Sequence, residues 1–378
     1  MKNIGIYVHI PFCKQKCKYC DFISFQCMED KFEDYFKCLI KEIGDKSEET
    51  IDEIDTIYIG GGTPSIVPAE YIERVIKEIF DKYKVSKNAE ITIEVNPGTV
   101  DEEKLKKYLS IGINRISIGL QSTNDELLKM LGRIHTYKEF EDVYEKVRKV
   151  GFKNINVDLM IGLPNQTIDD VEESLERIIN KNPEHISVYS LIVEENTKMF
   201  DLVNEGILKL PNEDLERKMY WRVKEILELN GYNHYEISNF SKVGFESKHN
   251  MNCWNQHDYF GFGVAAHSYF DGMRYSNIND LKRYIENLKN EEAVYNVVFH
   301  EKQDKEEMMK EYMVLGLRKI EGVKISEFKN KFVDNSLYVF RKELEKLTKN
   351  DLVIIDEDKI QLTKRGLDFA NMVWMEFV

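Results

Sequence analysis

The chain has 378 residues, of which 42% are hydrophobic and 32% charged, a composition typical of a soluble protein with a sizeable buried core. Its 53 Lys and Arg residues against 67 Asp and Glu give a formal net charge of −14, which argues against nucleic acid as the main partner because DNA-binding surfaces are usually basic. No run approaches the roughly 18 consecutive apolar residues of a membrane helix, and the N-terminus lacks the pattern of a signal peptide, so we expect a cytoplasmic protein without an integral membrane segment.

Strand-like and helix-like segments alternate along the first 230 residues, as in a parallel sheet with crossover helices. Apolar runs rich in β-branched residues predict strands at residues 4–10, 54–59, 90–95, 115–120, 154–160 and 185–191. Amphipathic segments predict helices at residues 30–44, 68–83, 101–109, 137–150, 168–180 and 212–230. Six such units predict an α/β fold built on a partial (β/α)6 barrel.

The last third of the chain predicts a sheet extension and a small C-terminal domain. Residues 232–275, rich in Gly, Asn and Tyr, are expected to extend the sheet and cover one side of the barrel. Helices at 304–320, 325–332 and 337–349, followed by a hairpin of residues 352–355 and 359–362, are typical of a winged-helix module. We therefore expect a core domain at 1–232, a connecting segment at 233–300 and a C-terminal domain at 301–378.

Two features of the C-terminal domain have alternative interpretations. Winged helices often bind DNA, but the basic residues of the predicted helix 337–349 alternate with Glu343 and Glu345, so DNA binding is not expected. The Met- and Leu-rich stripe of the helix at 304–320 is expected to belong to the core.

Three of the six cysteines lie within a short segment of the N-terminal region. Cys13, Cys17 and Cys20 have the spacing C-x3-C-x2-C. A structural zinc site normally uses four ligands in two pairs, and ferredoxin-type runs include a fourth cysteine nearby; neither pattern follows here. Cys27 and Cys38 are expected to be ordinary semi-buried thiols.

Three thiolates on one loop can hold three irons of a [4Fe-4S] cluster and leave the fourth iron open. An open iron can chelate the amino and carboxylate groups of S-adenosylmethionine (SAM) and pass an electron into its sulfonium, which yields a 5′-deoxyadenosyl radical. The spacing therefore predicts a [4Fe-4S] cluster with one open iron site and SAM as its ligand. Unligated or zinc-bound cysteines are the alternative.

Polar residues also lie at the ends of the predicted strands, where parallel barrels concentrate function. The second strand is followed by residues 60–65, Gly-Gly-Gly-Thr-Pro-Ser, whose amides and hydroxyl can bind the polar head of an amino acid. Glu94, Gln121 and Asp158 lie at or near the ends of the third, fourth and fifth strands, and Arg133 follows the fourth. Each alone is typical of a solvated loop, but together they predict a ligand site.

These motifs resemble the radical SAM superfamily, in particular the branch that contains oxygen-independent coproporphyrinogen III dehydrogenase (HemN) and the heme chaperone HemW. The matching segments are residues 7–13, 19–22, 60–65, 118–122 and 158–164. The resemblance implies that the cluster binds to the three cysteines named above. It also implies that the first SAM is lined by Tyr7, Tyr19, Gly61, Gly62, Thr63 and Glu94. A second SAM, if retained, would be held by Gln121, Arg133 and Asp158.

Two departures separate the subfamilies. The dehydrogenase has a further cysteine where this chain has Phe22, as heme chaperones do. Residues 249–254 match the chaperone motif His-Asn-x-x-Tyr-Trp, with Cys253 in place of the tyrosine. Since imidazole can ligate heme iron and indole can lie against the macrocycle, His249 and Trp254 are the predicted heme-binding residues. A thiolate is also an iron ligand, and His267 is a rival ligand that we expect to be packed in a Gly-rich turn.

The resulting hypothesis is a heme chaperone of HemW type that binds heme, the cluster and SAM and passes heme to an acceptor protein. A flavodoxin or ferredoxin is the expected electron donor. The alternative is an enzyme, oxygen-independent coproporphyrinogen III dehydrogenase, which decarboxylates its substrate oxidatively to protoporphyrinogen IX. A nucleic-acid-binding protein is a third class, which the net charge opposes. The sequence leaves open whether the chain is an enzyme, and no residue is assigned to catalysis.

Overall fold

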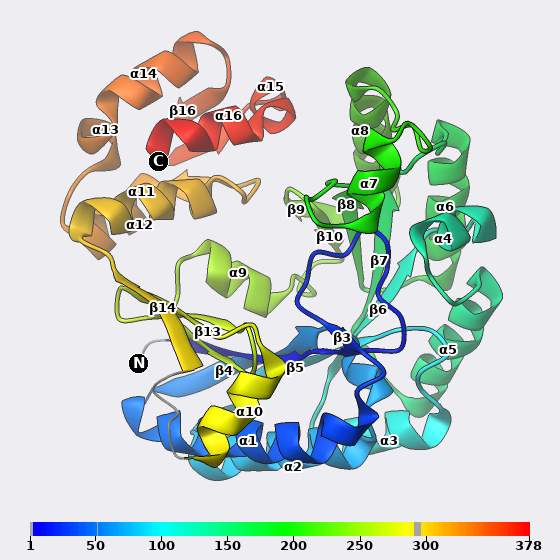
Figure 1. Cartoon of the computed structure of the whole chain (residues 1–378). Coiled ribbons are helices and arrows are strands. Elements are labelled where there is room, and N and C mark those ends of the chain that lie inside the picture. Colours follow the sequence, from blue (N-terminus) through cyan, green and yellow to red (C-terminus); the bar gives the residue numbers. More distant parts are fainter. Residues whose placement is uncertain (1–2, 51, 291–295) are drawn as a thin grey trace.

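The computed structural model describes residues 3–50, 52–290 and 296–378, and its centre is a large, mostly parallel sheet (Figure 1). Within the described residues the strand order of this sheet is β14-β13-β12-β11-β1-β4-β5-β6-β7-β8-β10-β9. Six neighbouring strands run parallel: β1 (Asn3–Ile10), β4 (Glu53–Gly61), β5 (Val85–Val95), β6 (Arg115–Gln121), β7 (Ile155–Ile161) and β8 (His185–Ser190). They confirm the predicted strands and the α/β fold with a partial barrel.

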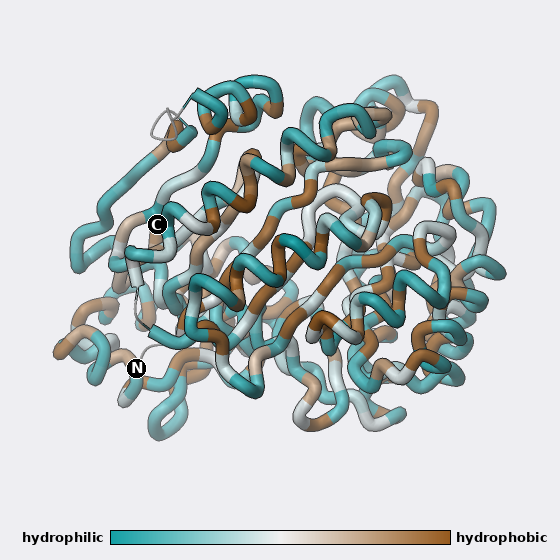
Figure 2. Tube along the Cα trace, turned by 90° about the horizontal axis from the view of Figure 1, so that it is seen from below, coloured by the Kyte–Doolittle hydropathy of each residue, from teal (hydrophilic) through white to brown (hydrophobic). Residues whose placement is uncertain are grey.

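Helices join successive parallel strands and cover the outer face of the sheet (Figure 1). The helices that confirm the prediction are α1 (Phe32–Asp45), α2 (Ala69–Lys82), α3 (Glu102–Ser110), α5 (Tyr137–Val150), α6 (Ile168–Lys181) and α8 (Glu213–Leu229). Hydrophilic and hydrophobic residues alternate along the helices seen from below, because each helix buries one side against the sheet (Figure 2).

Two short helices, α4 (Asp125–Leu131) and α7 (Lys198–Asn204), were not predicted. Each has 7 residues, about two turns, which is too short for a clear apolar period. α4 is nevertheless well capped: the Asn124 side chain accepts hydrogen bonds from two amides of its first turn, and Gly132 ends it with a φ of 80°. This cap fixes the start of the loop that carries Arg133.

Short strands extend the sheet at both edges of the barrel, whereas the sequence predicted cover on one side. β11 (Tyr259–Phe262) pairs in parallel with β1, and β12 (His267–Phe270), β13 (Met273–Asn277) and β14 (Val297–Lys302) follow it in antiparallel order. β10 (Asn239–Ser241) and β9 (Asn233–Glu236) extend the opposite edge beyond β8. Both edges of an open barrel expose unpaired backbone groups, so both need cover. Residues 291–295 of the predicted connecting segment 233–300 lie outside the described residues.

The chain crosses between these edges through α9 (Lys248–Trp254), which packs on β1 and β4. The edge formed by β11 to β14 is anchored to α1 through Glu42. The buried carboxylate of this residue accepts hydrogen bonds from Gly263 N at 2.8 Å, Asn277 Nδ2 at 2.6 Å and Tyr284 Oη at 2.7 Å. A further helix, α10 (Leu281–Lys289), packs on α1.

The C-terminal residues form a second hydrophobic core of their own. Its helices are α11 (Lys305–Gly316), α12 (Ile325–Phe332), α13 (Ser336–Val339), α14 (Arg341–Lys349), α15 (Lys364–Asp368) and α16 (Ala370–Trp374), and its small sheet consists of β15 (Val323–Lys324), β17 (Lys359–Leu362) and β16 (Val353–Asp356). Met309 and Met313 are buried, which confirms that the Met-rich stripe is core.

The predicted helix at 337–349 is wrong in one respect, because Phe340 breaks it. This residue has φ −107° and ψ 33°, outside the helical range, and its side chain is buried between the two short helices and the core. On α14, Arg341 and Lys346 pair with Glu345 and Glu376 at 2.8 and 2.6 Å, which neutralises part of its positive charge.

Within the described ranges of the chain, no helix has both the length and the apolar composition needed to cross a bilayer.

Candidate functional site

A cavity of about 420 Å³ opens at the carboxyl ends of the parallel strands, next to the cysteine loop. Most of the predicted site residues line it: Cys13, Cys17, Tyr19, Cys20, Gly61, Gly62, Thr63, Glu94, Gln121, Arg133 and Asp158. Tyr7, His249 and Trp254 are not part of the lining. The fold therefore gathers residues that are up to 145 positions apart in the sequence, from Cys13 to Asp158.

Backbone hydrogen bonds hold the cysteine loop against two short helices, α4 and α7. Lys18 N donates to Leu131 O at 2.9 Å, and Lys18 O accepts from Met199 N at 2.8 Å. Burial raises the pKa of the Cys13 thiol and raises that of Cys20 to about 11. Thiols in such a dry setting remain protonated unless a positive centre binds them.

Two of the sulfur atoms already accept hydrogen bonds from the cavity wall. Thr63 Oγ1 donates to Cys13 Sγ at 3.5 Å, and Arg133 Nη1 donates to Cys17 Sγ at 3.5 Å. Donors of this kind stabilise thiolates and tune iron–sulfur clusters. The neighbouring groups are thus suited to sulfur ligands that carry negative charge.

The three cysteines do not converge on a single point in this structure. Across residues 3–50, 52–290 and 296–378, no three Cys, His, Asp or Glu side chains converge on a point that one metal ion could occupy. In an iron–sulfur cluster each thiolate binds a different iron, so the sulfurs surround a larger object and need not converge. Three thiols of one loop that face one cavity fit a cluster of this kind.

The Gly-rich turn after β4 is shaped by close backbone contacts. A Cβ at Gly62 would lie 2.8 Å from Phe12 O, and Gly61 has a φ of 111°. The amides of Gly62 and Thr63 donate to Ile10 O and Phe12 O at 2.9 and 2.8 Å. In this structure these two amides bind backbone oxygens of the segment that leads into the cysteine loop, so ligand binding by the Gly-rich turn stays a prediction.

Two carboxyl groups face the cavity from β5 and β7. Glu94 accepts hydrogen bonds from Tyr58 Oη at 2.9 Å and from Gly61 N at 3.2 Å, and burial raises its pKa to about 7. Asp158 accepts from Asn156 Nδ2 at 2.7 Å and from Ser117 Oγ at 3.3 Å, and burial raises its pKa as well. A ligand that brings positive charge, such as an ammonium or a sulfonium, would favour the ionised form of both.

Gln121 ends β6 in a strained conformation. Its φ is 78°, and the pairing register of β6 with β7 shifts between Gly119 and Gln121. Bulges of this kind redirect side chains next to functional sites. Arg133 donates to Asn96 Oδ1 at 2.7 Å and to Gly119 O at 2.6 Å, so its guanidinium lies between the cysteine loop and the end of β6.

Tyr7 does not line the cavity, although its ring lies near that of Tyr58, which does. It is hydrogen-bonded to His9 Nδ1 at 2.9 Å, and its ring centroid is 6.3 Å from that of Tyr58. Tyr58 of β4 lines the cavity instead and was missed by the sequence analysis. Strand alternation was the available signal, since Ile57 and Ile59 are buried in the core while Tyr58 points into the barrel.

The two predicted heme residues are not brought together, although both belong to α9. His249 is buried, forms a hydrogen bond with Thr56 Oγ1 at 3.0 Å, and has a pKa that burial lowers to about 4. The ring of Trp254 lies 4.5 Å from the guanidinium carbon of Arg318, which is also 4.7 Å from Trp374. Five positions along a helix correspond to about 140° of rotation, so the two rings face different partners.

The remaining candidate residues differ partly from expectation. His267 is exposed on β12 and is not packed in a turn, because the alternation of this strand turns it outward. Cys27 is exposed at a residue with φ 55°, whereas Cys38 is buried in α1. Cys253 is half-buried, and burial raises its pKa to about 11, which opposes the thiolate form.

Comparisons with known proteins agree with this architecture, which is that of a radical SAM protein. The family description "Radical SAM superfamily" matches residues 7–178, and "HemN C-terminal domain" matches residues 303–369. The solved structure of coproporphyrinogen III oxidase (HemN) from Escherichia coli, described as a radical SAM enzyme, covers 100% of this chain and 90% of its own with a TM-score of 0.86. Its identity is 23%, so this likeness shows the fold alone.

Full-length relatives define the family more narrowly. The heme chaperone HemW of Lactococcus lactis is 37% identical, with 100% of this chain and 98% of that protein covered. The heme chaperone HemW of Bacillus subtilis is 38% identical, with 98% of each chain covered. This chain therefore belongs to the HemW family of the radical SAM superfamily.

Proposed function

We propose that this protein is a heme chaperone of the HemW type, which binds heme, a [4Fe-4S] cluster and SAM and passes heme to an acceptor protein. The observation that carries the proposal is the similarity to HemW proteins over the whole chain, including both the cysteine loop and the C-terminal domain. A cytoplasmic location and a flavodoxin or ferredoxin as electron donor belong to the same proposal.

Cys13, Cys17 and Cys20 would hold three irons of the cluster and leave one iron open for SAM. When bound, the cluster supplies an electron to the sulfonium of SAM. Glu94, with Tyr58 and Gly61 as its donors, offers negative charge to a cationic ligand. Tyr7, Tyr19, Gly62 and Thr63 complete the proposed first SAM site, and Gln121, Arg133 and Asp158 the second.

His249 is the proposed heme ligand. Its lowered pKa keeps the imidazole neutral, which is the form that binds iron. Because the ring is buried against Thr56 and lies 5.2 Å from the ring of Tyr58, heme binding at this residue requires α9 to move away from β4. Trp254, stacked on Arg318, would move with it.

The dehydrogenase remains the second candidate. The fold similarity to HemN favours it, but Phe22, 62% exposed at the cavity, stands where the dehydrogenase has its additional cysteine. The two candidates differ in chemistry: the chaperone binds heme and releases it intact, whereas the dehydrogenase converts coproporphyrinogen III.

The test uses one anaerobically reconstituted preparation for both activities. We expect saturable heme binding in an absorbance titration and no protoporphyrinogen IX from coproporphyrinogen III. His249→Ala should weaken heme binding, whereas His267→Ala, an exposed histidine on β12, should leave it unchanged. Absence of heme binding to the protein with an intact cluster would reject the proposal, and substrate conversion would favour the dehydrogenase.

A further inference from the structure

Arg115, the first residue of β6, lies in the cavity wall, and within the described residues its side chain has no hydrogen-bonded partner. It is 2% exposed and lines the cavity, and its Nε is buried without a hydrogen bond. Throughout the described ranges of the chain, its guanidinium has no ion pair and no side-chain hydrogen bond. A buried guanidinium without a hydrogen-bonded acceptor is unusual, because taking its charge out of water is costly.

The direction of the side chain follows from the strand. Ile116, Ile118 and Leu120 of β6 are buried in the hydrophobic core. The alternate residues Arg115, Ser117, Gly119 and Gln121 line the cavity. Since Gln121 ends β6 near the cysteine loop and Arg115 begins the strand, Arg115 lies at the deep end of the cavity.

The nearby carboxyl groups have other partners. Glu94 is engaged by Tyr58 and Gly61, and Asp158 by Asn156 and Ser117. The charge of Arg115 partly opposes the rise in the pKa of both carboxyl groups, but within the described part of the chain neither accepts a hydrogen bond from it. The other ionisable groups close to Arg115 are His185, His249, Tyr58 and Tyr235. Burial keeps both histidines neutral and both phenols protonated, so none of these four residues supplies a negative charge.

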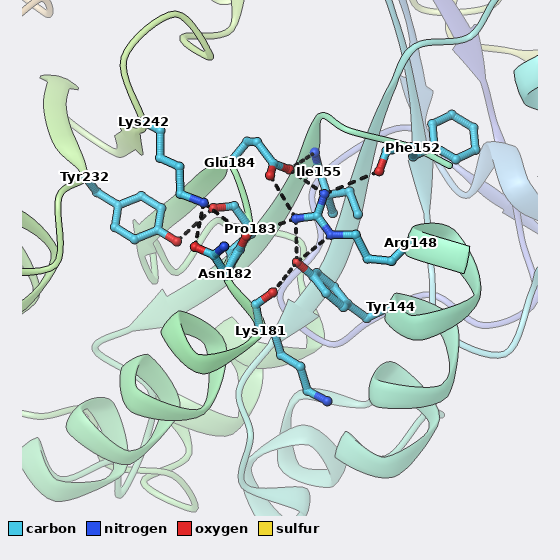
Figure 3. Close-up of polar contacts among 10 residues, drawn as sticks. All are labelled: Tyr144, Arg148, Phe152, Ile155, Lys181, Asn182, Pro183, Glu184, Tyr232 and Lys242. Atoms are coloured by element: carbon cyan, nitrogen blue, oxygen red, sulfur yellow. Dashed lines mark hydrogen bonds and ion pairs between the residues drawn. The ribbon is translucent and has the colours of Figure 1, made fainter. Parts of the chain in front are cut away.

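Arg148 of α5 shows how this chain satisfies an arginine that has only a structural role (Figure 3). Its nitrogens donate to Tyr144 Oη at 2.8 Å, Phe152 O at 3.3 Å and Asn182 O at 3.0 Å, and they pair with Glu184 at 2.9 Å. In the part of the chain that the structure describes, Arg115 has no such set of acceptors. The contrast indicates that the acceptor for Arg115 comes from outside the chain.

We infer that Arg115 is a further binding residue of this cavity and takes a carboxylate group of the bound ligand. A planar guanidinium binds a carboxylate through two parallel hydrogen bonds, and Arg115 lines the cavity in which such a ligand would lie. Asn250, from the start of α9, also lines the cavity and adds an amide. The carboxylate has two sources, the methionyl group of the second SAM or a propionate of heme, since the carboxylate of the first SAM would bind the open iron. The inference rests on the proposed function for these two identities.

Four probes distinguish the sources: SAM, decarboxylated SAM, hemin and hemin dimethyl ester. For Arg115→Gln we expect binding of a carboxylate probe to weaken by about 10- to 100-fold, the range of a hydrogen bond to a charged group. Binding of its carboxylate-free counterpart should stay within about twofold of wild type. Arg115→Lys should recover part of the loss, and Arg148→Gln is the matched control that leaves all four affinities unchanged. If only SAM and decarboxylated SAM differ in this way, SAM is the source of the carboxylate. If only hemin and hemin dimethyl ester differ, heme is the source.

Thermal unfolding without ligand separates binding from folding. Because Arg115→Gln removes no hydrogen bond or ion pair among the described residues, its Tm should stay close to that of the wild type, whereas Arg148→Gln, which removes several, should lower it. A Tm lowered as much as by Arg148→Gln would overturn the inference. Three other outcomes would also overturn it. Arg115→Gln could bind all probes as tightly as the wild type does, it could lose equal affinity for probes with and without the carboxylate, or the wild type could bind neither SAM nor hemin. If the wild type binds SAM but not hemin, the chaperone function fails, and the SAM pair still decides the role of Arg115.

Discussion

The buried carboxyl group of Glu94 should make this protein less stable as the pH rises through neutrality, and Glu94→Gln should remove that loss. In the folded state burial is the main cause that raises its pKa from 4.5 to about 7. The folded protein therefore holds this proton more tightly than the unfolded chain does. The resulting stabilisation is complete below pH 4.5 and is lost as the pH rises to about 7.

The size of the effect follows from the difference between these two pKa values. One pKa unit corresponds to about 1.4 kcal/mol, so the wild type should lose about 3 kcal/mol relative to Glu94→Gln between pH 4.5 and 8. Water in the cavity screens the charge and makes this an upper figure. Carboxyl groups that do not interact with Glu94 cancel in the difference, whereas Asp158, whose charge raises the pKa of Glu94, contributes to it.

Denaturant unfolding at half-unit steps of pH measures this difference directly. The exposed residue Glu70 provides the control, since Glu70→Gln should keep the pH profile of the wild type. A cationic ligand near Glu94 should lower its pKa again, so SAM binding near pH 6.5 should release a proton from the wild type but not from Glu94→Gln. Parallel stability profiles for wild type and Glu94→Gln would refute the reasoning.

Three further outcomes are expected. Serine in place of any one cluster cysteine should abolish the visible absorbance of the reconstituted protein, because two thiolates cannot hold three irons. The control variant Cys27→Ser should retain this absorbance. Full cluster content in the single variants would show that the ligands are wrongly assigned. Trp254→Ala should weaken the docking of the C-terminal domain by about 1 kcal/mol through loss of the contact with Arg318, seen as faster hydrogen exchange in α16; unchanged exchange would contradict this role. Glu42→Gln should destabilise the fold by about 1–3 kcal/mol, since an amide cannot accept all three hydrogen bonds, and a Tm equal to that of the wild type would argue against it.

Much of the barrel could be predicted because its signals are local. The parallel strands are continuous apolar runs and the helices between them have a regular apolar stripe, so both can be read from short windows. The short strands β9 to β14 have no such signal, since their pairing is decided by the edges that they cover. The break at Phe340 was missed for a similar reason: a buried ring holds this residue out of the helix.

The sequence by itself determined the chemistry of the cysteine loop, because three thiols on one short segment stay close together in any fold. It also determined most of the cavity lining, since residues at the ends of successive parallel strands meet at one edge of the sheet. Only the tertiary structure decided the environment of each group. It separated Trp254 from His249, turned Tyr58 into the barrel and, among the described residues, left Arg115 Nε without a hydrogen-bonded partner, because partners that are far apart in the sequence meet only when the barrel closes.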